Sequence, residues 1–279
     1  MARVLSANVS SLRKNKAFWI CMLGMVVYAV SFSFSTYYDY LEYGALSSPA
    51  HLIFNHQPLM GILSAVFCSL FLGTEYSDGT IRNKLIVGRT RTEIYLANFM
   101  TVALASILFY AICLAFVLLF GFLLLDLRLS SMQVGVLAGT VLVGVMSILA
   151  FCAVFTMLSM LNQRKAVVAV ISILLALGLL LLSSMLDSRL SEPEFYDNYV
   201  LTASGVPELA TESVANPRYL GPTARAICQF LQDFLPSGQS IQIFSLTQTQ
   251  MWQMPLYSLL IVALTTSAGV FFFRRKDLK

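Results

Sequence analysis

Charged residues are scarce in this sequence. They make up 11% of its 279 residues, while hydrophobic residues make up 58% and the mean hydropathy is +0.77. Soluble proteins are about 45–50% apolar and about 25% charged. The composition therefore excludes a soluble globular chain and predicts one polytopic membrane domain.

Several motifs of enzymes and nucleotide-binding proteins are also missing. The sequence has no Gly-x-x-x-x-Gly-Lys-Ser/Thr loop, no Gly-x-Ser-x-Gly and no His-Glu-x-x-His. It therefore does not bind ATP through the first motif, and nothing indicates a catalytic or metal site. The two histidines, His51 and His56, fall in a predicted outer loop without a nearby cysteine, so ordinary loop residues are favoured over a metal site.

Cysteine pairs are absent as well. Four of the five cysteines (Cys21, Cys68, Cys113 and Cys152) fall in apolar runs, and only Cys228 lies outside them. An extracellular disulfide within the chain is excluded, and no Cys-x-x-Cys spacing indicates a metal site. The cysteines are expected to be packing residues.

Six apolar runs reach, or nearly reach, the roughly 20 residues that a transmembrane helix needs. They are Ala17–Ser35, Pro58–Leu72, Ile94–Leu125, Val134–Met160, Ala166–Leu186 and Pro255–Phe273. The second is short and is expected to borrow residues from both flanks, and the third is long enough to bend or to extend beyond the bilayer. The expected fold is an all-α membrane protein with six transmembrane helices, which form a single domain over residues 1–279.

The basic residues between these runs predict the orientation of the chain, because positive charge is enriched in cytoplasmic loops. With both termini in the cytoplasm, only four of the 18 basic residues fall outside, namely Arg128, Arg189, Arg218 and Arg225. The other 14 fall inside, whereas acidic residues are mostly outside. The net charge of +4 is therefore a topology signal and does not indicate nucleic-acid binding.

None of the six runs contains Asp, Glu, Lys, Arg or His. Ionisable residues inside the membrane normally mark proton or ion pathways. Their absence argues against a carrier driven by an ion gradient, and favours a path of Ser, Thr, Tyr, Phe and Met that suits an amphipathic or lipid-like cargo. Asn98, near the start of the third run, is the most polar buried candidate.

Residues 1–16 form a separate element before the first run. Ala2, Leu5, Val9 and Leu12 recur at helical spacing, with Asn8 off this apolar stripe. A short basic amphipathic helix of this kind lies in the membrane interface. The alternative is a frayed basic tail that only sets the topology.

The segment of residues 73–93, here called the charged segment, follows the second run and is expected inside. It holds four basic and three acidic residues among its 21. Asp78 is a candidate N-cap for a short helix over Thr80–Val87, Gly88 can end that helix, and Thr90 to Glu93 match a capping box for the third span. Ile81, Leu85 and Ile86 are assigned to one face. These features leave open a plain linker helix or a helix that receives force from a soluble partner.

Residues 187–254 form the only long segment outside the membrane. Thr223–Leu235 predicts an amphipathic helix that starts after Pro222 and carries Ile227, Phe230 and Leu231 on one face. This helix and the stretch after Pro236 are expected to lie on, or dip into, the outer leaflet.

Together these features resemble the ABC-2-type permeases. The charged segment reads Glu75-Tyr76-x-x-Gly79-Thr80-Ile81-Arg82-x-Lys84-Leu85, followed by Arg89-Thr90-Arg91-x-Glu93-Ile94-Tyr95. This is similar to the family's Glu-x-x-x-Gly-Thr-hydrophobic segment and to the Ser/Thr-Arg start of its third span. The turn Leu235-Pro236-Ser237-Gly238 is also similar, and the layout of six spans covers the whole chain.

The resemblance implies that the chain is the permease subunit of an ATP-driven exporter in the cell membrane. The expected coupling residues are Glu75, Tyr76, Gly79, Thr80, Ile81, Arg82, Lys84 and Leu85. They would dock a separate cytoplasmic ABC ATPase, which would bind the ATP and Mg, while this chain itself holds no cofactor. A second permease copy or a sister permease would complete the complex. The cargo would be a peptide, a drug or a lipid-like molecule, with efflux of antimicrobial peptides as one example. The alternative is a non-transporting membrane sensor or scaffold that binds a ligand through residues 187–254.

Overall fold

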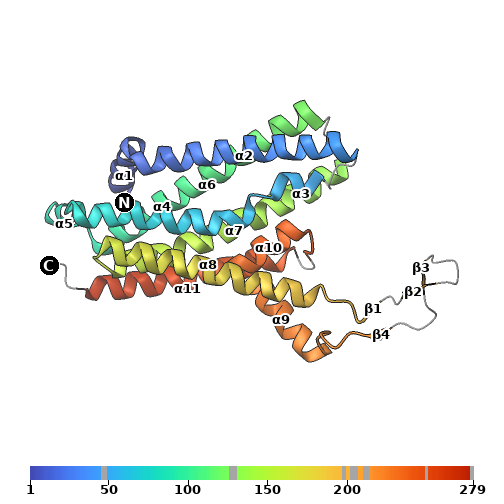
Figure 1. Ribbon diagram of the computed structural model, residues 1–279. Coiled ribbons are helices and arrows are strands. Elements are labelled where there is room, and N and C mark those ends of the chain that lie inside the picture. Colours follow the sequence, from blue (N-terminus) through green and yellow to red (C-terminus); the bar gives the residue numbers. More distant parts are fainter. Residues whose placement is uncertain are drawn as a thin grey trace.

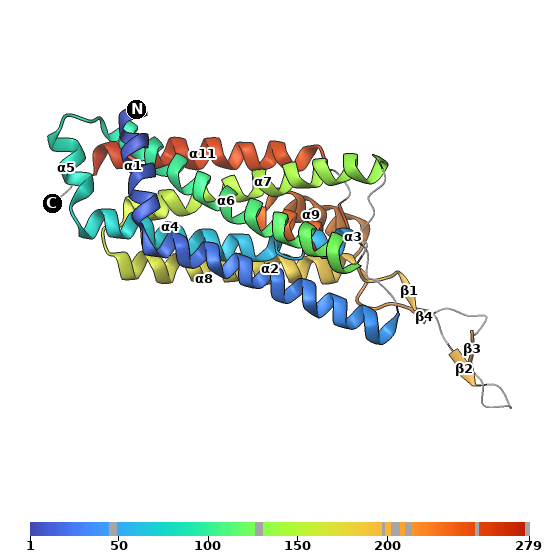
Figure 2. The same cartoon turned by 90° about the horizontal axis from the view of Figure 1, so that it is seen from above.

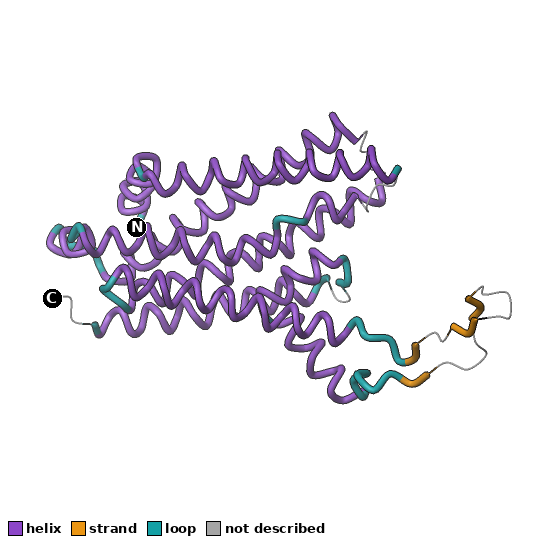
Figure 3. The backbone as a smooth tube through the Cα atoms, viewed as in Figure 1, coloured by secondary structure: helices purple, strands orange, loops and turns teal. Residues whose placement is uncertain are grey.

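The computed structural model describes residues 1–44, 49–125, 131–196, 199–201, 207–209, 214–248 and 251–276. These residues form a bundle of long helices that run alongside one another (Figure 1). Helices account for nearly all of the described chain, and loops gather at the two ends of the bundle (Figure 3). The predicted all-α fold is confirmed.

Among the described residues, six helices are long and apolar enough to cross a membrane, as predicted. They are α2 (Lys16–Tyr43), α4 (Gln57–Ser77), α6 (Arg91–Leu125), α7 (Ser131–Leu161), α8 (Lys165–Leu190) and α11 (Gln253–Arg275). The short helix α3 (Pro49–Phe54) precedes α4, and the second candidate span covers His51–Ser77. The apolar run Pro58–Leu72 lies within this longer span, which takes residues from both flanks, as expected.

The centre of the bundle is formed by α4 and α7. In the apolar part of each span, 61% of the residues are buried in the second span and 56% in the fourth. In the first, fifth and sixth spans only 22% are buried. The first, fifth and sixth spans expose leucine and isoleucine along their outer faces, including Leu23, Leu181 and Leu264. Such all-round apolarity is typical of helices that face lipid.

One end of the bundle, here called the basic end, holds the N-terminus, the C-terminal end of α11, α1 (Ala2–Lys14) and α5 (Thr80–Ile86) (Figure 1). Helix α1 runs across the long helices (Figure 2). Its buried residues are Val4, Asn8 and Leu12. The predicted helix is confirmed. Of the predicted stripe, Leu12 is buried, Leu5 and Val9 are half-buried and Ala2 is exposed, whereas Asn8, expected off the stripe, is buried.

The opposite end holds the remaining elements. Two short antiparallel ribbons pair β1 (Phe195–Tyr196) with β4 (Val214–Ala215) and β2 (Tyr199–Leu201) with β3 (Pro207–Leu209). They are followed by α9 (Pro222–Phe234) and α10 (Pro236–Ser245). The amphipathic helix expected over Thr223–Leu235 is therefore present.

Helix α10 enters the bundle and packs against α4, α7 and α8. Its residues from Pro236 to Ile243 are all buried. The corner between α9 and α10 is tight, since a Cβ placed on Gly238 would lie 2.1 Å from the carbonyl oxygen of Gln232. Glycine permits this close approach of two backbones.

Candidate functional site

The site lies at the basic end, where the charged segment forms a helical hairpin tip. Helix α5 begins after Gly79 and is followed by Gly88, and both glycines have positive φ (68° and 84°). At its C-terminus the Arg89 amide donates to the Lys84 carbonyl and the Gly88 amide donates to the Leu85 carbonyl, which is a Schellman motif. The expected N-cap, Asp78, instead ends α4, because the left-handed Gly79 stands between it and α5.

The start of α6 has the capping box expected for Thr90 to Glu93. The Thr90 amide donates to a Glu93 carboxylate oxygen at 3.3 Å, and the Glu93 amide donates to the Thr90 hydroxyl at 3.2 Å. The other Glu93 oxygen pairs with the N-terminal ammonium of Met1 at 2.7 Å. The first residue of the chain is thereby tied to the first turn of α6.

Helix α5 has one buried face and one exposed face. Ile81 is buried and Leu85 packs partly against the core, whereas Ile86 and Val87 are each 75% exposed. The assignment of Ile86 to the buried face is wrong. At about 100° per residue around the helix axis, the side chain of Ile86 points about 140° away from that of Ile81. The side chain of Leu85 points only about 40° away from that of Ile81. Arg82 and Asn83 are exposed as well.

Behind α5 lies a connected set of four polar side chains, here called the Glu75 network: Glu75, Lys84, Asn8 and Asn98. The Lys84 ammonium donates to one Glu75 oxygen at 2.6 Å and to the Asn8 carbonyl oxygen at 2.8 Å. The Asn98 amide donates to the second Glu75 oxygen at 3.0 Å. The Asn8 amide donates to the Asn98 carbonyl oxygen at 2.7 Å. The network therefore joins α1, α4, α5 and α6.

The burial of this network determines its energetics. The Glu75 side chain is 8% exposed and the Lys84 side chain 17%. A buried charge is tolerated when it is paired and when its remaining oxygens or protons are hydrogen-bonded. Glu75 meets this condition, because both of its carboxylate oxygens accept hydrogen bonds.

A second set of contacts connects α4 with α7 and with the end of α11. The Tyr76 hydroxyl and the Lys276 ammonium both donate to the Met160 carbonyl, at 2.5 Å and 3.0 Å. Lys276 also lies over the Tyr76 ring, 4.8 Å from its centroid. Burial lowers the pKa of Lys276 from its usual 10.5 to about 8, because desolvation disfavours the charged amine.

The eight predicted coupling residues therefore divide into two groups. Arg82 is exposed on α5. The other seven lie between α5 and the bundle: Glu75, Tyr76, Ile81, Lys84 and Leu85 face the bundle, Thr80 donates its hydroxyl to the Glu75 carbonyl at 2.9 Å, and Gly79 forms the turn before α5. Sequence reasoning missed Asn8, Met160 and Lys276 as partners and Ile86 and Val87 as exposed residues. The buried, hydrogen-bonded position of Asn98 agrees with its polarity within an apolar run.

The expectation of spans free of ionisable residues is wrong for the second span. Glu75 lies in the last turn of α4, and His56 is fully buried next to the Tyr110 ring, with 4.9 Å between the ring centroids. The part of the predicted outer loop from Leu52 to His56 packs into the bundle. The ionisable content of the spans therefore does not distinguish an exporter from an ion-coupled carrier.

A comparison with protein families identifies the chain. The model of a family described as "ABC-2 family transporter protein" matches residues 5–183, which is more than half of the chain. The chain belongs to the ABC-2 transporter family. It is a multi-pass membrane protein and a permease subunit of an ABC transporter. The match extends from α1 into α8, so it includes the charged segment and the Glu75 network of this ABC-2 permease. A search of curated proteins found no match.

Proposed function

We propose that this permease forms the path of an ATP-driven exporter, and that α5 is the coupling helix on which a separate cytoplasmic ABC ATPase docks. The observation that carries this proposal is the division of α5 into two faces. Its outer face offers Arg82, Asn83, Ile86 and Val87, while its inner face is anchored to three other helices through the Glu75 network.

The orientation in this proposal follows from charge. Basic residues gather at the basic end, where α1, α5 and the end of α11 (Figure 1) carry Arg13, Lys14, Lys84, Arg274 and Arg275. Because cytoplasmic segments are enriched in Lys and Arg, the basic end faces the cytoplasm and α9 faces the outside. The ATP and Mg are held by the ATPase, and a second permease copy or a sister permease completes the complex.

The exposed pair Ile86 and Val87 is the strongest evidence that a partner docks on this surface of the basic end. Large apolar side chains at a protein surface mark interaction sites when they cluster and are rimmed by polar residues. Here two adjacent aliphatic residues follow the exposed Arg82 and Asn83. They lie at the C-terminal end of α5, the helix at the basic end of the bundle (Figure 1).

The cargo in this proposal is a peptide, a drug or a lipid-like molecule, with export of antimicrobial peptides as one possible role. The inner helices α4 and α7 carry serine, threonine and glutamine among apolar residues, for example Ser64, Thr156 and Gln57. A path of this composition suits an amphipathic cargo more than a strongly charged one.

The test is Val87→Asp, with Val214→Asp as the matched control. Val87 is 75% exposed at the basic end and Val214 is 54% exposed at the opposite end. The full-length chain is purified from its native membrane in mild detergent, and the co-purifying ATPase activity is measured. We expect Val87→Asp to lower this activity at least about tenfold, because a carboxylate would be buried in the interface, and Val214→Asp to leave it unchanged.

Two outcomes contradict the proposal. If the wild-type chain co-purifies with no ATPase activity, the energy source is wrong and a sensor or scaffold that acts through residues 187–254 is favoured. If both aspartate variants retain the activity, an ATPase is bound but not through α5. Size-exclusion profiles of each variant confirm that the chain remains folded.

A further inference from the structure

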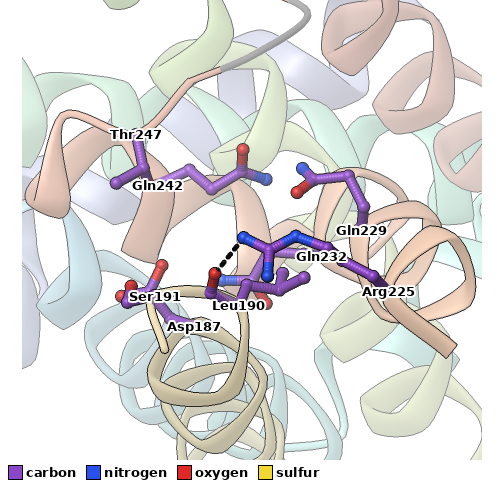
Figure 4. Close-up of a pocket in the computed structure, with 8 residues that line it drawn as sticks. All are labelled: Asp187, Leu190, Ser191, Arg225, Gln229, Gln232, Gln242 and Thr247. Atoms are coloured by element: carbon purple, nitrogen blue, oxygen red, sulfur yellow. Dashed lines mark hydrogen bonds between the residues drawn. The ribbon is translucent and has the colours of Figure 1, made fainter. Parts of the chain in front are cut away.

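A second candidate site lies at the end of the bundle opposite to α5. A cavity of about 220 Å³ opens between the last turn of α8 and the helices α9 and α10. Asp187 and Ser191 line it from α8 and the residue after it, Arg225, Gln229 and Gln232 from α9, and Gln242 from α10 (Figure 4). None of these residues belongs to the Glu75 network, and the family match ends before α9.

Helix α9 presents its polar face to this cavity. Arg225, Gln229 and Gln232 recur at spacings of four and three, which places them on one side of the helix. Ile227 and Phe230 on the other side are 57% and 51% exposed. A helix of a soluble protein would bury the apolar side instead. The arrangement therefore indicates that the outer face of α9 contacts lipid and its inner face contacts a polar ligand.

Some of the polar atoms around the cavity are already paired. The side-chain amides of Gln229 and Gln242 both donate to one Asp233 oxygen, at 2.9 Å and 2.8 Å. One Arg225 nitrogen donates to the Leu190 carbonyl, and Ser245 donates to Asp187 at 3.0 Å. These contacts hold the lining side chains in place, and Figure 4 shows the ends of Arg225, Gln229 and Gln242 converging on one opening.

Other polar atoms there are buried without a partner among the described residues. They are the second terminal nitrogen of Arg225, both amide atoms of Gln232 and the amide oxygen of Gln242. Gln232 is 0% exposed and Gln242 is 1% exposed. A buried donor or acceptor left unpaired is unfavourable, and each such group calls for an explanation. A bound ligand with both acceptors and donors would satisfy all of them.

We propose that this cavity binds the zwitterionic headgroup of an aminophospholipid such as phosphatidylethanolamine. The phosphate would accept hydrogen bonds from Arg225 and from the Gln232 amide nitrogen. The primary ammonium would donate to the oxygens of Gln232 and Gln242 and face the Asp187 carboxylate. This site goes beyond the ATPase docking proposed above and does not depend on it.

The composition of the cavity distinguishes this headgroup from others. A purely anionic headgroup would satisfy Arg225 but would leave the Gln242 oxygen unpaired and would face the negative charge of Asp187. A choline headgroup has no N–H to donate. The lipid source follows from α9, because the helix that lines the cavity exposes its opposite, apolar face, which is typical of contact with lipid. The volume of about 220 Å³ is below the range of about 300–1,000 Å³ for drug-sized ligands and therefore suits a small headgroup.

The test is native mass spectrometry of the purified full-length chain in mixed micelles. The micelles contain dioleoyl phosphatidylethanolamine, dioleoyl phosphatidylcholine or dioleoyl phosphatidylglycerol at equal concentration. We expect one retained phosphatidylethanolamine and at least about tenfold weaker binding of the other two lipids, since hydrogen bonds to charged groups are the strong ones. Arg225→Gln and Asp187→Asn should each reduce retention about tenfold, while Arg218→Gln, which changes an arginine outside the cavity lining, should not.

Each other outcome overturns a defined part of this proposal. Equal retention of the three lipids, or unchanged retention in both Arg225→Gln and Asp187→Asn, refutes the site. Competition by glycerophosphoethanolamine at concentrations equal to that of the lipid would assign the site to a soluble zwitterion and refute the lipid source. If Arg225→Gln fails to fold, Asp187→Asn decides alone, because its side chain keeps an oxygen for Ser245. ATPase co-purification is measured on the same variants and should be unchanged.

Discussion

The Glu75 network can be tested by replacing Glu75 with Gln. The substitution conserves volume but removes the charge that neutralises Lys84. It also removes one acceptor, because an amide has a single oxygen and Glu75 now receives hydrogen bonds on two. Either Lys84 or Asn98 would then face the amide NH₂ group. If the NH₂ group faces Lys84, the Lys84 ammonium keeps only its contact with Asn8.

The expected loss of stability follows from burial. Removing one partner of a buried ion pair costs about 3–5 kcal/mol. The Lys84 side chain is 17% exposed, so water can reach part of its ammonium, and we expect a loss of about 2–4 kcal/mol. For a chain of this size that corresponds to a fall of roughly 5–10 °C in the apparent melting temperature. Unfolding of membrane proteins in detergent is often irreversible, so all variants are compared at one scan rate.

Glu93→Gln is the matched control. It makes the same chemical change at the same end of the bundle, but the Glu93 side chain is 31% exposed and pairs with the N-terminal ammonium. Exposed pairs contribute little to stability, so we expect a shift of less than about 3 °C. The double variant Glu75→Gln with Lys84→Met leaves no unpaired charge and should recover at least half of the loss. Equal shifts for Glu75→Gln and Glu93→Gln, or no recovery in the double variant, would refute the reasoning.

Two further predictions concern packing and pH. Gly238→Ala should destabilise the protein by about 1–3 kcal/mol or more, since its Cβ would lie 2.1 Å from the Gln232 carbonyl oxygen. Gly178→Ala, whose Cβ would have no atom within 4 Å, should be neutral or stabilising by up to about 1 kcal/mol. Thermal melting of both variants checks this prediction, and equal effects would contradict it. The pKa of Lys276 is lowered to about 8 in the folded chain, so between pH 8 and 10 the unfolded chain binds more protons than the folded chain. The contribution of Lys276 to the melting temperature should therefore increase with pH over that range. Lys276→Met should remove this contribution, and an unchanged slope in the variant would count against the lowered pKa.

Features of the charged segment that depend on neighbouring residues could be predicted from the sequence. Gly88 after the last turn of a short helix and the pair Thr90 and Glu93 each define local hydrogen bonds, and both occur as expected. The prediction of Asp78 as the N-cap of α5 was wrong because Asp78 and Gly79 are adjacent and either could precede the helix. The backbone of Gly79 decides between them, since it adopts a positive φ.

Contacts between distant residues could not be predicted in this way. Hydropathy ends the second span before Glu75, yet α4 continues because Lys84 and Asn98 satisfy the carboxylate from nine and 23 residues away. The same contacts explain Asn8, whose polarity argued for an exposed position and whose partners lie 76 and 90 residues further along the chain. The cavity proposed to bind lipid is a similar case. Its lining residues Asp187 and Arg225 are separated in the sequence by the end of α8, the β-ribbons and the start of α9.

The anchoring of α5 also indicates how a docked ATPase would move the permease. At both ends α5 joins its neighbours through a glycine with positive φ, Gly79 and Gly88, and glycine backbones bend at low energy. A displacement applied at Ile86 and Val87 would therefore be transmitted less through the covalent chain than through Lys84, whose ammonium is hydrogen-bonded to both α4 and α1.

Variants of the docking surface and variants of the Glu75 network should therefore affect different steps of transport. Val87→Asp should lose the ATPase, whereas Glu75→Gln should keep it bound and lose ATP-dependent transport in vesicles. Equal loss of binding in both variants would show that the network only supports the fold of the docking surface.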